Sequence, residues 1–446
     1  MSRLVWKRGA QPDVLVGGAH VMDPRTRLDG PHDLLIRDGE IAELGEPGSL
    51  QAPQGAEVID GEGRHLFPAF FDPHVHLRTP GFEHKEDLQT GTRAAGAGGF
   101  AGIVAMPNTA PVVDAAPVLR SLMDDARTTA SVPVGFLAAI SRGLRGEELT
   151  EMAELRDEGA LGFTDDGMPV ADAGLLRRAF QYQRLCGGVL ALHEEDPRLS
   201  AGGSMHEGEV STRLGLGGIP SIAESTFIER DATLARYESG RMHVQHVTCA
   251  DAVQAVATAK ERGTQITAEA SPHHLILTDE AIAASLDTRL KMNPPLRTEA
   301  DRSAVVQALR SGVLDCIATD HAPHAREEKE VPFEQAMMGT TGLETAFAAI
   351  YTELVLPGVL TLELLIDRLT AGAAVFDLPV SRIAPGEAAN VCLIDLGAIW
   401  TVGAAGYESR SDNCCFADRD LRGKVLLTVA DGSVAYRERS LALSAA

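Results

Sequence analysis

Hydrophobic and polar positions divide the chain into two kinds of segment. Toward both ends, short apolar or alternating runs bounded by turn residues predict β-strands. Asp38-Gly39 separates two such runs and favours a type I′ hairpin, and Asp431-Gly432 marks a similar turn near the other end. The expected strands cover residues 13–16, 33–37, 40–44, 57–60, 390–394, 424–429 and 433–436.

The middle of the chain has a different pattern, in which apolar runs alternate with amphipathic helical stretches such as 147–158 and 250–262. Such alternation is typical of β/α units around a parallel sheet, and eight repeats predict a (β/α)8 TIM barrel. A doubly wound open sheet is the alternative, but no G-x-G-x-x-G motif follows the first run. The eight runs are 66–71, 101–106, 132–137, 160–163, 188–192, 242–245, 265–268 and 315–318.

These two patterns predict a fold of the α/β class with two domains. Residues 66–384 are expected to form the barrel. Residues 1–65 and 385–446 are expected to form a small β-sandwich domain together, because the two ends of a barrel chain lie close in space.

Composition and charge narrow the function. Acidic residues outnumber basic ones by 63 to 40, and the net charge of −23 disfavours partners that need a basic surface, such as nucleic acid and anionic membranes. No apolar stretch of membrane-spanning length and no secretory signal is apparent. The six cysteines show no C-x-x-C spacing, so we expect reduced thiols and a cytoplasmic protein.

Residues that can bind a metal follow five of the apolar runs. His74 and His76 follow the first run, and His193, His246 and Asp320 follow the fifth, sixth and eighth. Asp165 or Asp166 follows the fourth run. Active sites of TIM barrels lie at the carboxyl ends of the strands, so these side chains are expected to converge on one mouth.

The chemistry of the set fits a binuclear metal centre. Histidines two apart on an extended segment face the same way and can hold one ion, while His193 and His246 can hold a second. Each position alone is weak evidence, since Asp-Asp-Gly is commonly a turn and a single histidine is commonly a packed one. Five such positions in the right order favour the metal site.

This order of residues resembles the amidohydrolase superfamily, and the finer motifs resemble the type I dihydroorotases. The resemblance runs from residue 72 to residue 324, with weaker similarity over the β-rich ends. The motifs are Asp72-Pro73-His74-Val75-His76-Leu77-Arg78, Met106-Pro107-Asn108-Thr109, Phe163-Thr164-Asp165-Asp166-Gly167, Lys291-Met292-Asn293-Pro294-Pro295-Leu296-Arg297 and Asp320-His321-Ala322-Pro323-His324.

The resemblance implies two Zn²⁺ ions per subunit. His74, His76 and Asp320 would hold one ion, His193 and His246 the other, and Asp166 would bridge them; the family spacing to His193 favours Asp166 over Asp165. Related cyclic amidases use a carboxylated lysine as the bridge, and residues 141–175 contain no lysine. Asp320 is also expected to move the proton during catalysis. Cobalt or manganese remains open, because His/Asp sites accept several divalent ions.

The resemblance also implies a set of substrate contacts. The guanidinium of Arg78 can grip a carboxylate with two parallel hydrogen bonds. Asn108 and His324 can bind the same anion or the ring, and Asn293 can pair with ring amide groups. The backbone of Met338 and Gly339, in the loop after the eighth run, completes the set; a solvated loop is the alternative there.

The implied activity is the zinc-dependent interconversion of N-carbamoyl-L-aspartate and L-dihydroorotate in pyrimidine biosynthesis. A hydantoinase or allantoinase is one alternative, disfavoured by the missing lysine and by the Met-Pro-Asn-Thr segment. A non-catalytic structural paralogue is another, disfavoured because all six metal-ligand positions are intact. The resemblance further implies a homo-oligomer and an association with aspartate transcarbamoylase.

Overall fold

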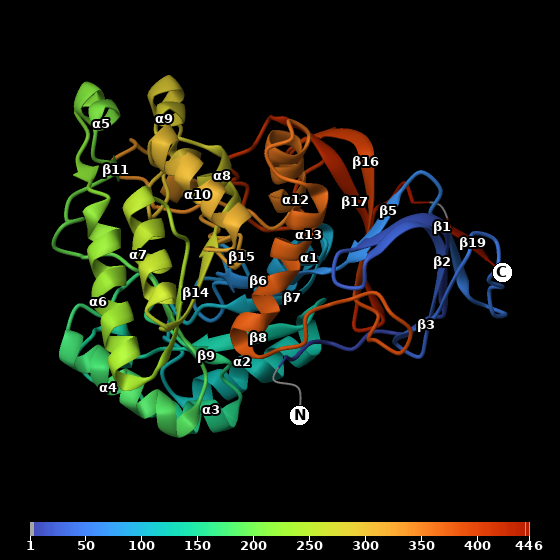
Figure 1. The fold of residues 1–446 in the computed structure, drawn as a ribbon, viewed down its shortest axis with the longest axis horizontal. Helices are drawn as coiled ribbons and strands as arrows, with labels where there is room; N and C mark the ends of the chain where they lie inside the picture. Colours follow the sequence, from blue (N-terminus) through green and yellow to red (C-terminus); the bar gives the residue numbers. More distant parts are fainter. Residues whose placement is uncertain (1–3, 442, 446) are drawn as a thin grey trace.

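The computed structural model describes residues 4–441 and 443–445, and Figure 1 shows a helix-covered barrel with a separate sheet at one side. Eight parallel strands follow one another around the barrel in sequence order. Beyond the last strand, His321 pairs with Val75 of the first, and the His76 amide donates to the His321 carbonyl at 2.9 Å. The predicted parallel barrel is therefore confirmed. Its strands are β6 (Phe70–Val75), β7 (Phe100–Ala105), β8 (Val134–Ala138), β9 (Gly162–Phe163), β10 (Leu190–Leu192), β13 (Arg241–Val244), β14 (Gln265–Ala270) and β15 (Cys316–Ile317).

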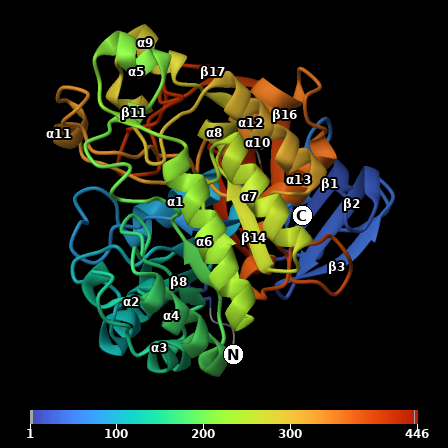
Figure 2. The ribbon, with the colours of Figure 1, turned by 60° about the vertical axis from the view of Figure 1, so that its left-hand side comes forward.

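Helices cover the outside of the barrel, as the turned view in Figure 2 also shows. Helix α4 illustrates why they form: Asp172 caps its first turn by accepting from the Leu175 amide, and Leu176 and Phe180 are buried one turn apart. The longer helices are α1 (Leu88–Ala97), α2 (Ala116–Thr129), α3 (Met152–Glu158), α4 (Ala173–Cys186), α6 (Ile222–Glu238), α7 (Ala250–Glu261), α10 (Glu299–Ser311) and α13 (Leu362–Thr370). The helix expected from residue 147 begins only at Met152.

Shorter elements lie in the connections on the barrel rim. These are β11 (Met205–His206), α5 (Glu209–Leu214), β12 (Gly218–Ile219), α8 (Pro272–Ile276), α9 (Glu280–Ser285), α11 (Arg326–Lys329) and α12 (Ala346–Ile350).

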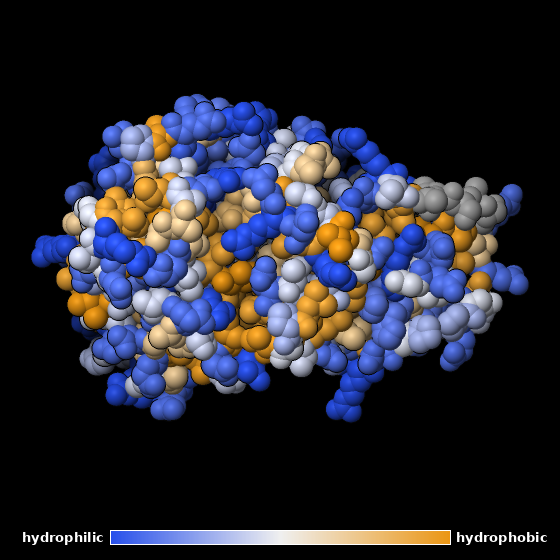
Figure 3. All heavy atoms as spheres, turned by 90° about the horizontal axis from the view of Figure 1, so that it is seen from above, coloured by the Kyte–Doolittle hydropathy of each residue, from blue (hydrophilic) through white to orange (hydrophobic). Residues whose placement is uncertain are grey.

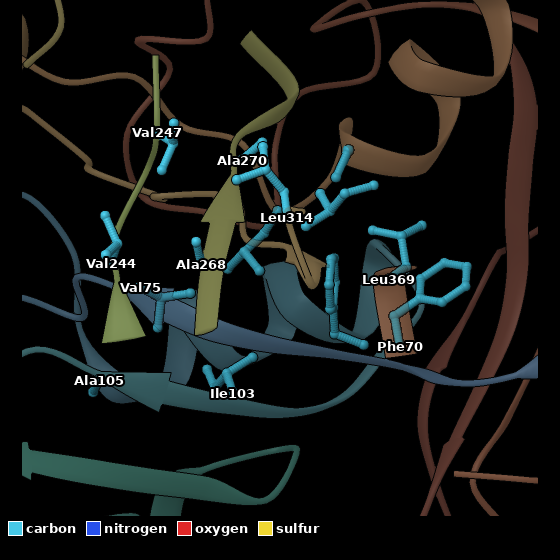
Figure 4. Packing of buried hydrophobic residues seen from close by; sticks show 14 of the residues in the cluster. Phe70, Val75, Ile103, Ala105, Val244, Val247, Ala268, Ala270, Leu314 and Leu369 are labelled. Atoms are coloured by element: carbon cyan, nitrogen blue, oxygen red, sulfur yellow. The ribbon is translucent and has the colours of Figure 1, made fainter. Parts of the chain in front are cut away.

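Strand alternation divides the buried side chains of the barrel strands between two clusters. Ile103 and Ala105 belong to the large cluster that includes the covering helices, with Val244 and Ala268 (Figure 4). Val104, between them, belongs to a second cluster with Phe71, Leu137, Leu161 and Ala191. Successive side chains of a strand point to opposite faces, so this second cluster fills the barrel interior.

The two ends of the chain pair with each other, as expected, and their strands join into one nine-stranded sheet where a sandwich was predicted. Strand β16 pairs with β5 and β19 pairs with β4, which joins the two ends directly. Its strands are β1 (Val14–Asp23), β2 (Leu28–Arg37), β3 (Glu40–Gly45), β4 (Glu57–Asp60), β5 (His65–Pro68), β16 (Val391–Thr401), β17 (Asp420–Ala430), β18 (Ser433–Arg437) and β19 (Leu443–Ala445).

Both predicted hairpin turns have the required backbone. Asp38 and Gly39 have φ of 53° and 82°, and Asp431 and Gly432 have φ of 46° and 75°. Type I′ turns need positive φ at both central residues. The Asp-Gly pairs therefore set these two strand connections.

The first apolar run of the middle segment, residues 66–71, is not one strand. Its first part lies in β5 of the end sheet, and Ala69 separates it from β6 of the barrel. The barrel strand therefore begins at Phe70 and extends to Val75, which brings His74 inside it. Domain boundaries at residues 65 and 385 stay a prediction.

The surface in Figure 3 is mainly hydrophilic, with hydrophobic side chains in patches. None of the helices in the described part of the chain is both long and apolar enough to cross a membrane.

Candidate metal centre

All six predicted metal-ligand residues lie at the carboxyl ends of the barrel strands and are buried. His74 lies within β6 and His76 directly after β6. The other four follow β9, β10, β13 and β15, in that order: Asp166, His193, His246 and Asp320.

His74, His76 and Asp320 form one group. Asp320 Oδ1 lies 3.5 Å from His74 Nε2 and 3.2 Å from His76 Nε2. The three ligand atoms thus face one small volume.

Asp166 lies between this group and the two remaining histidines. Its Oδ1 is 3.6 Å from His193 Nδ1 and 4.0 Å from His246 Nε2, while its Oδ2 is 3.4 Å from His76 Nε2. The two oxygens of one carboxylate thus face different histidines. This is the arrangement that a bridging ligand requires.

Asp165 faces the other way. Its Oδ1 accepts from the amides of Ile140 and Ser141 at 2.8 and 3.0 Å, and its Oδ2 accepts from the Ser141 hydroxyl. Because neighbouring residues of an extended segment point to opposite sides, only one of the pair can face the histidines. The structure turns Asp166 toward them and Asp165 away.

The rear nitrogen of three histidines is already hydrogen-bonded to an oxygen. His74 Nδ1 lies 2.8 Å from Glu269 Oε1, His76 Nδ1 lies 3.0 Å from Asn108 Oδ1, and His193 Nε2 lies 3.2 Å from Glu195 Oε2. An acceptor at the rear places the hydrogen there and leaves a lone pair at the front nitrogen. Histidines that bind metals are oriented in this way, so the donor set fits divalent ions.

Charges in the cluster are strongly coupled. Burial opposes ionisation of Asp166 and Asp320, yet the surrounding imidazoles, His74 first, lower the pKa of both carboxyls. Burial likewise opposes protonation of His74, but Glu269, Asp320 and Asp166 raise its pKa well above the ordinary value. The cluster is a buried concentration of carboxylates that requires nearby positive charge, which bound cations would supply.

The backbone is strained at three of these rim positions. Arg78, His246 and Asp320 have φ of 59°, 34° and 48°, a region that costs side-chain-bearing residues about 1–3 kcal/mol. At His246 and Asp320 this backbone re-aims a metal-ligand candidate at the end of its strand. Such strain persists only where the surrounding structure holds it.

Arg78 and His324 lie together beside the cluster. Arg78 Nε donates to the Pro323 carbonyl at 3.1 Å, and an Nη atom lies 3.5 Å from His324 Nε2. His324 Nε2 in turn lies 2.8 Å from the Met338 carbonyl oxygen. The structure thus brings together three predicted substrate contacts; Gly339 follows Met338 and is buried.

The two asparagines lie at the edge of the cluster. Asn108 contacts His76 and also donates from Nδ2 to Asp166 Oδ2 at 3.2 Å, so in this structure it holds two metal-ligand candidates. Asn293 Nδ2 lies 3.4 Å from His193 Nε2, and its buried Oδ1 has no hydrogen-bond partner among the described residues. Their contacts with substrate stay a prediction.

Glu269 is a residue of this site that the sequence analysis missed. Its Oε1 contacts His74 and accepts from the His246 amide at 3.2 Å, and its Oε2 lies 2.9 Å from His243 Nε2. One buried carboxylate thus connects His74 with His246, which lie in different parts of the cluster. Its position on the seventh strand, directly after the apolar run 265–268, is the only signal the sequence offered.

Fold and site together define a hydrolase of the amidohydrolase type whose His/Asp cluster could hold metal ions. Residues 63–252 match a family model described as "Dihydro-orotase-like". The L-hydantoinase (dihydropyrimidinase) structure from Arthrobacter aurescens matches with a TM-score of 0.85 at 23% identity, covering 96% of this chain and 97% of that one. That likeness supports the fold.

Curated relatives are much closer in sequence. The dihydroorotase of Anaeromyxobacter dehalogenans strain 2CP-1 is 46% identical over 429 residues, 96% of this chain and 98% of the relative. That of Pelotomaculum thermopropionicum is 44% identical over 427 residues, 96% and 99% of the two chains. The chain belongs to the dihydroorotase family, whose members are cyclic amidohydrolases.

Proposed function

We propose that this chain catalyses the reversible ring closure of N-carbamoyl-L-aspartate to L-dihydroorotate in pyrimidine biosynthesis. The observation that carries the proposal is the gathering of two carboxylates and four imidazoles around one buried volume, with the Arg78 guanidinium beside it. Arg78 is the cation suited to a substrate carboxylate. The curated relatives that match this chain over nearly their full length are named dihydroorotase, which favours this activity over that of a hydantoinase or allantoinase.

The proposed cofactor is a pair of Zn²⁺ ions. His74, His76 and Asp320 would hold one, His193 and His246 the other, with Asp166 shared between them. Bound divalent ions at such a site acidify water and polarise a carbonyl group.

Asp320 moves the proton in this proposal. Its Oδ1 faces His74 and His76, while no hydrogen bond to Oδ2 is found among the described residues. In the hydrolytic direction Oδ2 accepts the proton of the attacking water and delivers it to the ring nitrogen that leaves. In the cyclising direction the same oxygen takes the proton from the ureido nitrogen as that nitrogen attacks the carboxyl carbon, and delivers it to the oxygen that leaves as water.

Arg78 and its neighbours hold the substrate. Arg78 uses Nε on the Pro323 carbonyl, so its two outer nitrogens, one of which lies 3.5 Å from His324 Nε2, are the ones that would bind the carboxylate. The net charge of −23 repels an anionic substrate. At physiological salt, charges farther away than about 8 Å are largely screened, so close to the site the attraction of Arg78 outweighs this repulsion. Asn293, with its free Oδ1, pairs with a ring amide N–H.

Ring opening by the purified, zinc-loaded protein tests the proposal. Dihydroorotate should be hydrolysed and hydantoin should not. Turnover of hydantoin alone would overturn the assignment, and absence of both activities would favour a structural paralogue.

Three further features stay predictions. These are the homo-oligomer, the association with aspartate transcarbamoylase and the cytoplasmic location. The cytoplasmic location was expected from the cysteine spacing, and the six cysteines are free thiols in the structure. Sedimentation of the chain with and without aspartate transcarbamoylase tests the first two.

A further inference from the structure

The connection between β16 and β17 leaves the end sheet and contacts the barrel rim. Residues 402–419 form it, and Figure 1 shows both strands beside the barrel. Ser411 Oγ donates to the Lys85 carbonyl at 2.6 Å, and Arg326 forms an ion pair with Asp412 at 2.6 Å. A segment near residue 410 therefore lies against loops that follow the first and eighth barrel strands.

Asn413 makes three further buried contacts with the barrel rim. Its side-chain Oδ1 accepts from the His324 amide at 3.1 Å. Its Nδ2 donates to the carbonyls of Ala322 and Gly339, each at 3.1 Å. The residue is 3% exposed, so these bonds are shielded from bulk solvent and losing them would leave buried polar groups without partners.

The three partners belong to two segments that carry three of the six predicted substrate contacts, namely His324, Met338 and Gly339. His324 lies on the segment after β15, and Gly339 follows Met338 on the returning segment. The segments also touch directly, since the Ala322 amide donates to the Thr340 carbonyl at 2.8 Å. One amide side chain thus ties both to the end sheet.

The spacing between these segments is tight. Gly339 has φ of 141°, and a Cβ there would lie 2.8 Å from Ala322 Cβ and 3.0 Å from His324 Cδ2. A small relative shift of the two segments would therefore change the distance from the His324 ring to the Met338 carbonyl. Both groups line the proposed binding site next to Arg78.

We propose that Asn413 is a positioning residue that holds His324 and the Met338–Gly339 backbone in register for substrate binding. The inference rests on the proposed function for the identity of the substrate. It assigns a role at the site to a residue of the connection between β16 and β17, more than 70 positions from the nearest predicted contact.

Kinetics of two variants test the role. Asn413→Ala removes all three side-chain hydrogen bonds. Asn413→Asp keeps an acceptor for the His324 amide but replaces the Nδ2 donor with an oxygen, which cannot donate to the carbonyls of Ala322 and Gly339. Both should raise KM about tenfold with kcat within about threefold, and both should keep wild-type metal content. Ser411→Ala is the matched control, because it removes a buried bond of the same connection without touching 322–341.

Hydrogen exchange of the substrate-free protein gives a second readout that needs no activity. The amides of residues 322–341 should exchange about tenfold faster in Asn413→Ala than in Ser411→Ala. If the wild type fails to hydrolyse dihydroorotate while this exchange result holds, the proposed function fails and the positioning of the two segments stands.

Two results would overturn the inference. One is a folded Asn413→Ala variant with the KM and exchange rates of Ser411→Ala. The other is failure of both Asn413 variants to fold, since the residue would then serve the fold itself.

Discussion

Asp165→Ala and Asp166→Ala remove neighbouring carboxylates that face opposite ways, so the two variants should fail differently. Asp166 faces four histidines from both halves of the centre. Loss of one outer hydrogen-bond partner of a metal ligand already costs 10–100-fold in affinity or activity. We therefore expect Asp166→Ala to lose bound metal and at least ~100-fold in kcat/KM.

Asp165→Ala should instead weaken the fold. It leaves the buried amides of Ile140 and Ser141 without an acceptor, at a cost of about 1–3 kcal/mol each. The wild-type carboxylate also has an unfavourable burial cost. Burial raises the pKa of Asp165 to about 6, although the hydrogen bonds from Ser141 and Ile140 lower it. These effects oppose each other, so we expect the low end, a loss of about 2 kcal/mol in the free energy of unfolding.

Elemental analysis after dialysis, combined with denaturant unfolding, separates the two expectations. Asp165→Ala should retain metal and unfold at lower denaturant, whereas Asp166→Ala should lose metal. Metal loss in Asp165→Ala together with full metal in Asp166→Ala would refute the assignment of the bridge.

Three further predictions concern substrate binding, proton transfer and pH. Arg78→Lys keeps the charge but loses the planar fork, so KM should rise and kcat/KM fall with metal retained; unchanged kcat/KM would place Arg78 outside the site. Asp320→Asn keeps a coordinating oxygen but cannot accept a proton, so ring opening should fall at least ~100-fold while much of the metal stays bound. Near wild-type turnover with normal metal would move the proton-transfer role to another group, and His324 would be the next residue to test. Burial raises the pKa of Glu344 from 4.5 to about 7, although the Glu408 and Ser409 amides donate to it. The folded state therefore binds this proton more tightly, and the free energy of unfolding should fall as pH rises from about 4.5 to 7. Glu344→Gln cannot ionise at this position. The decrease in its free energy of unfolding between pH 5 and 8, measured by denaturation, should therefore be smaller than in the wild type by up to about 3 kcal/mol. An equal decrease in both proteins would contradict this.

Local sequence pattern predicted the repeating architecture well. The eight strand-and-helix repeats and the hairpins at Asp38-Gly39 and Asp431-Gly432 depend on residues close in sequence, through the periods of strands and helices and the positive φ of the turns. The order of metal-ligand candidates was equally readable, because the carboxyl ends of barrel strands always meet at one rim.

Side-chain direction and long-range pairing were not readable in this way. The run 66–71 has one apolar pattern, yet its first part pairs with β16, more than 300 residues away, and its second part pairs with β7. Asp165 and Asp166 are chemically identical, and only the position of the Ile140 and Ser141 amides turns one of them away from the histidines.

The sequence by itself therefore determined the fold class, the family and the residue types of the metal centre, since these follow from local periodicity and short motifs. Only the tertiary structure decided that Glu269 joins His74 to the His246 backbone and that Asn413 reaches from the end sheet to His324 and Gly339. A hydrogen bond between residues far apart in sequence leaves no periodic trace in either segment. It forms because the closed barrel and the joined ends bring buried polar groups together, and a buried polar group must find a partner.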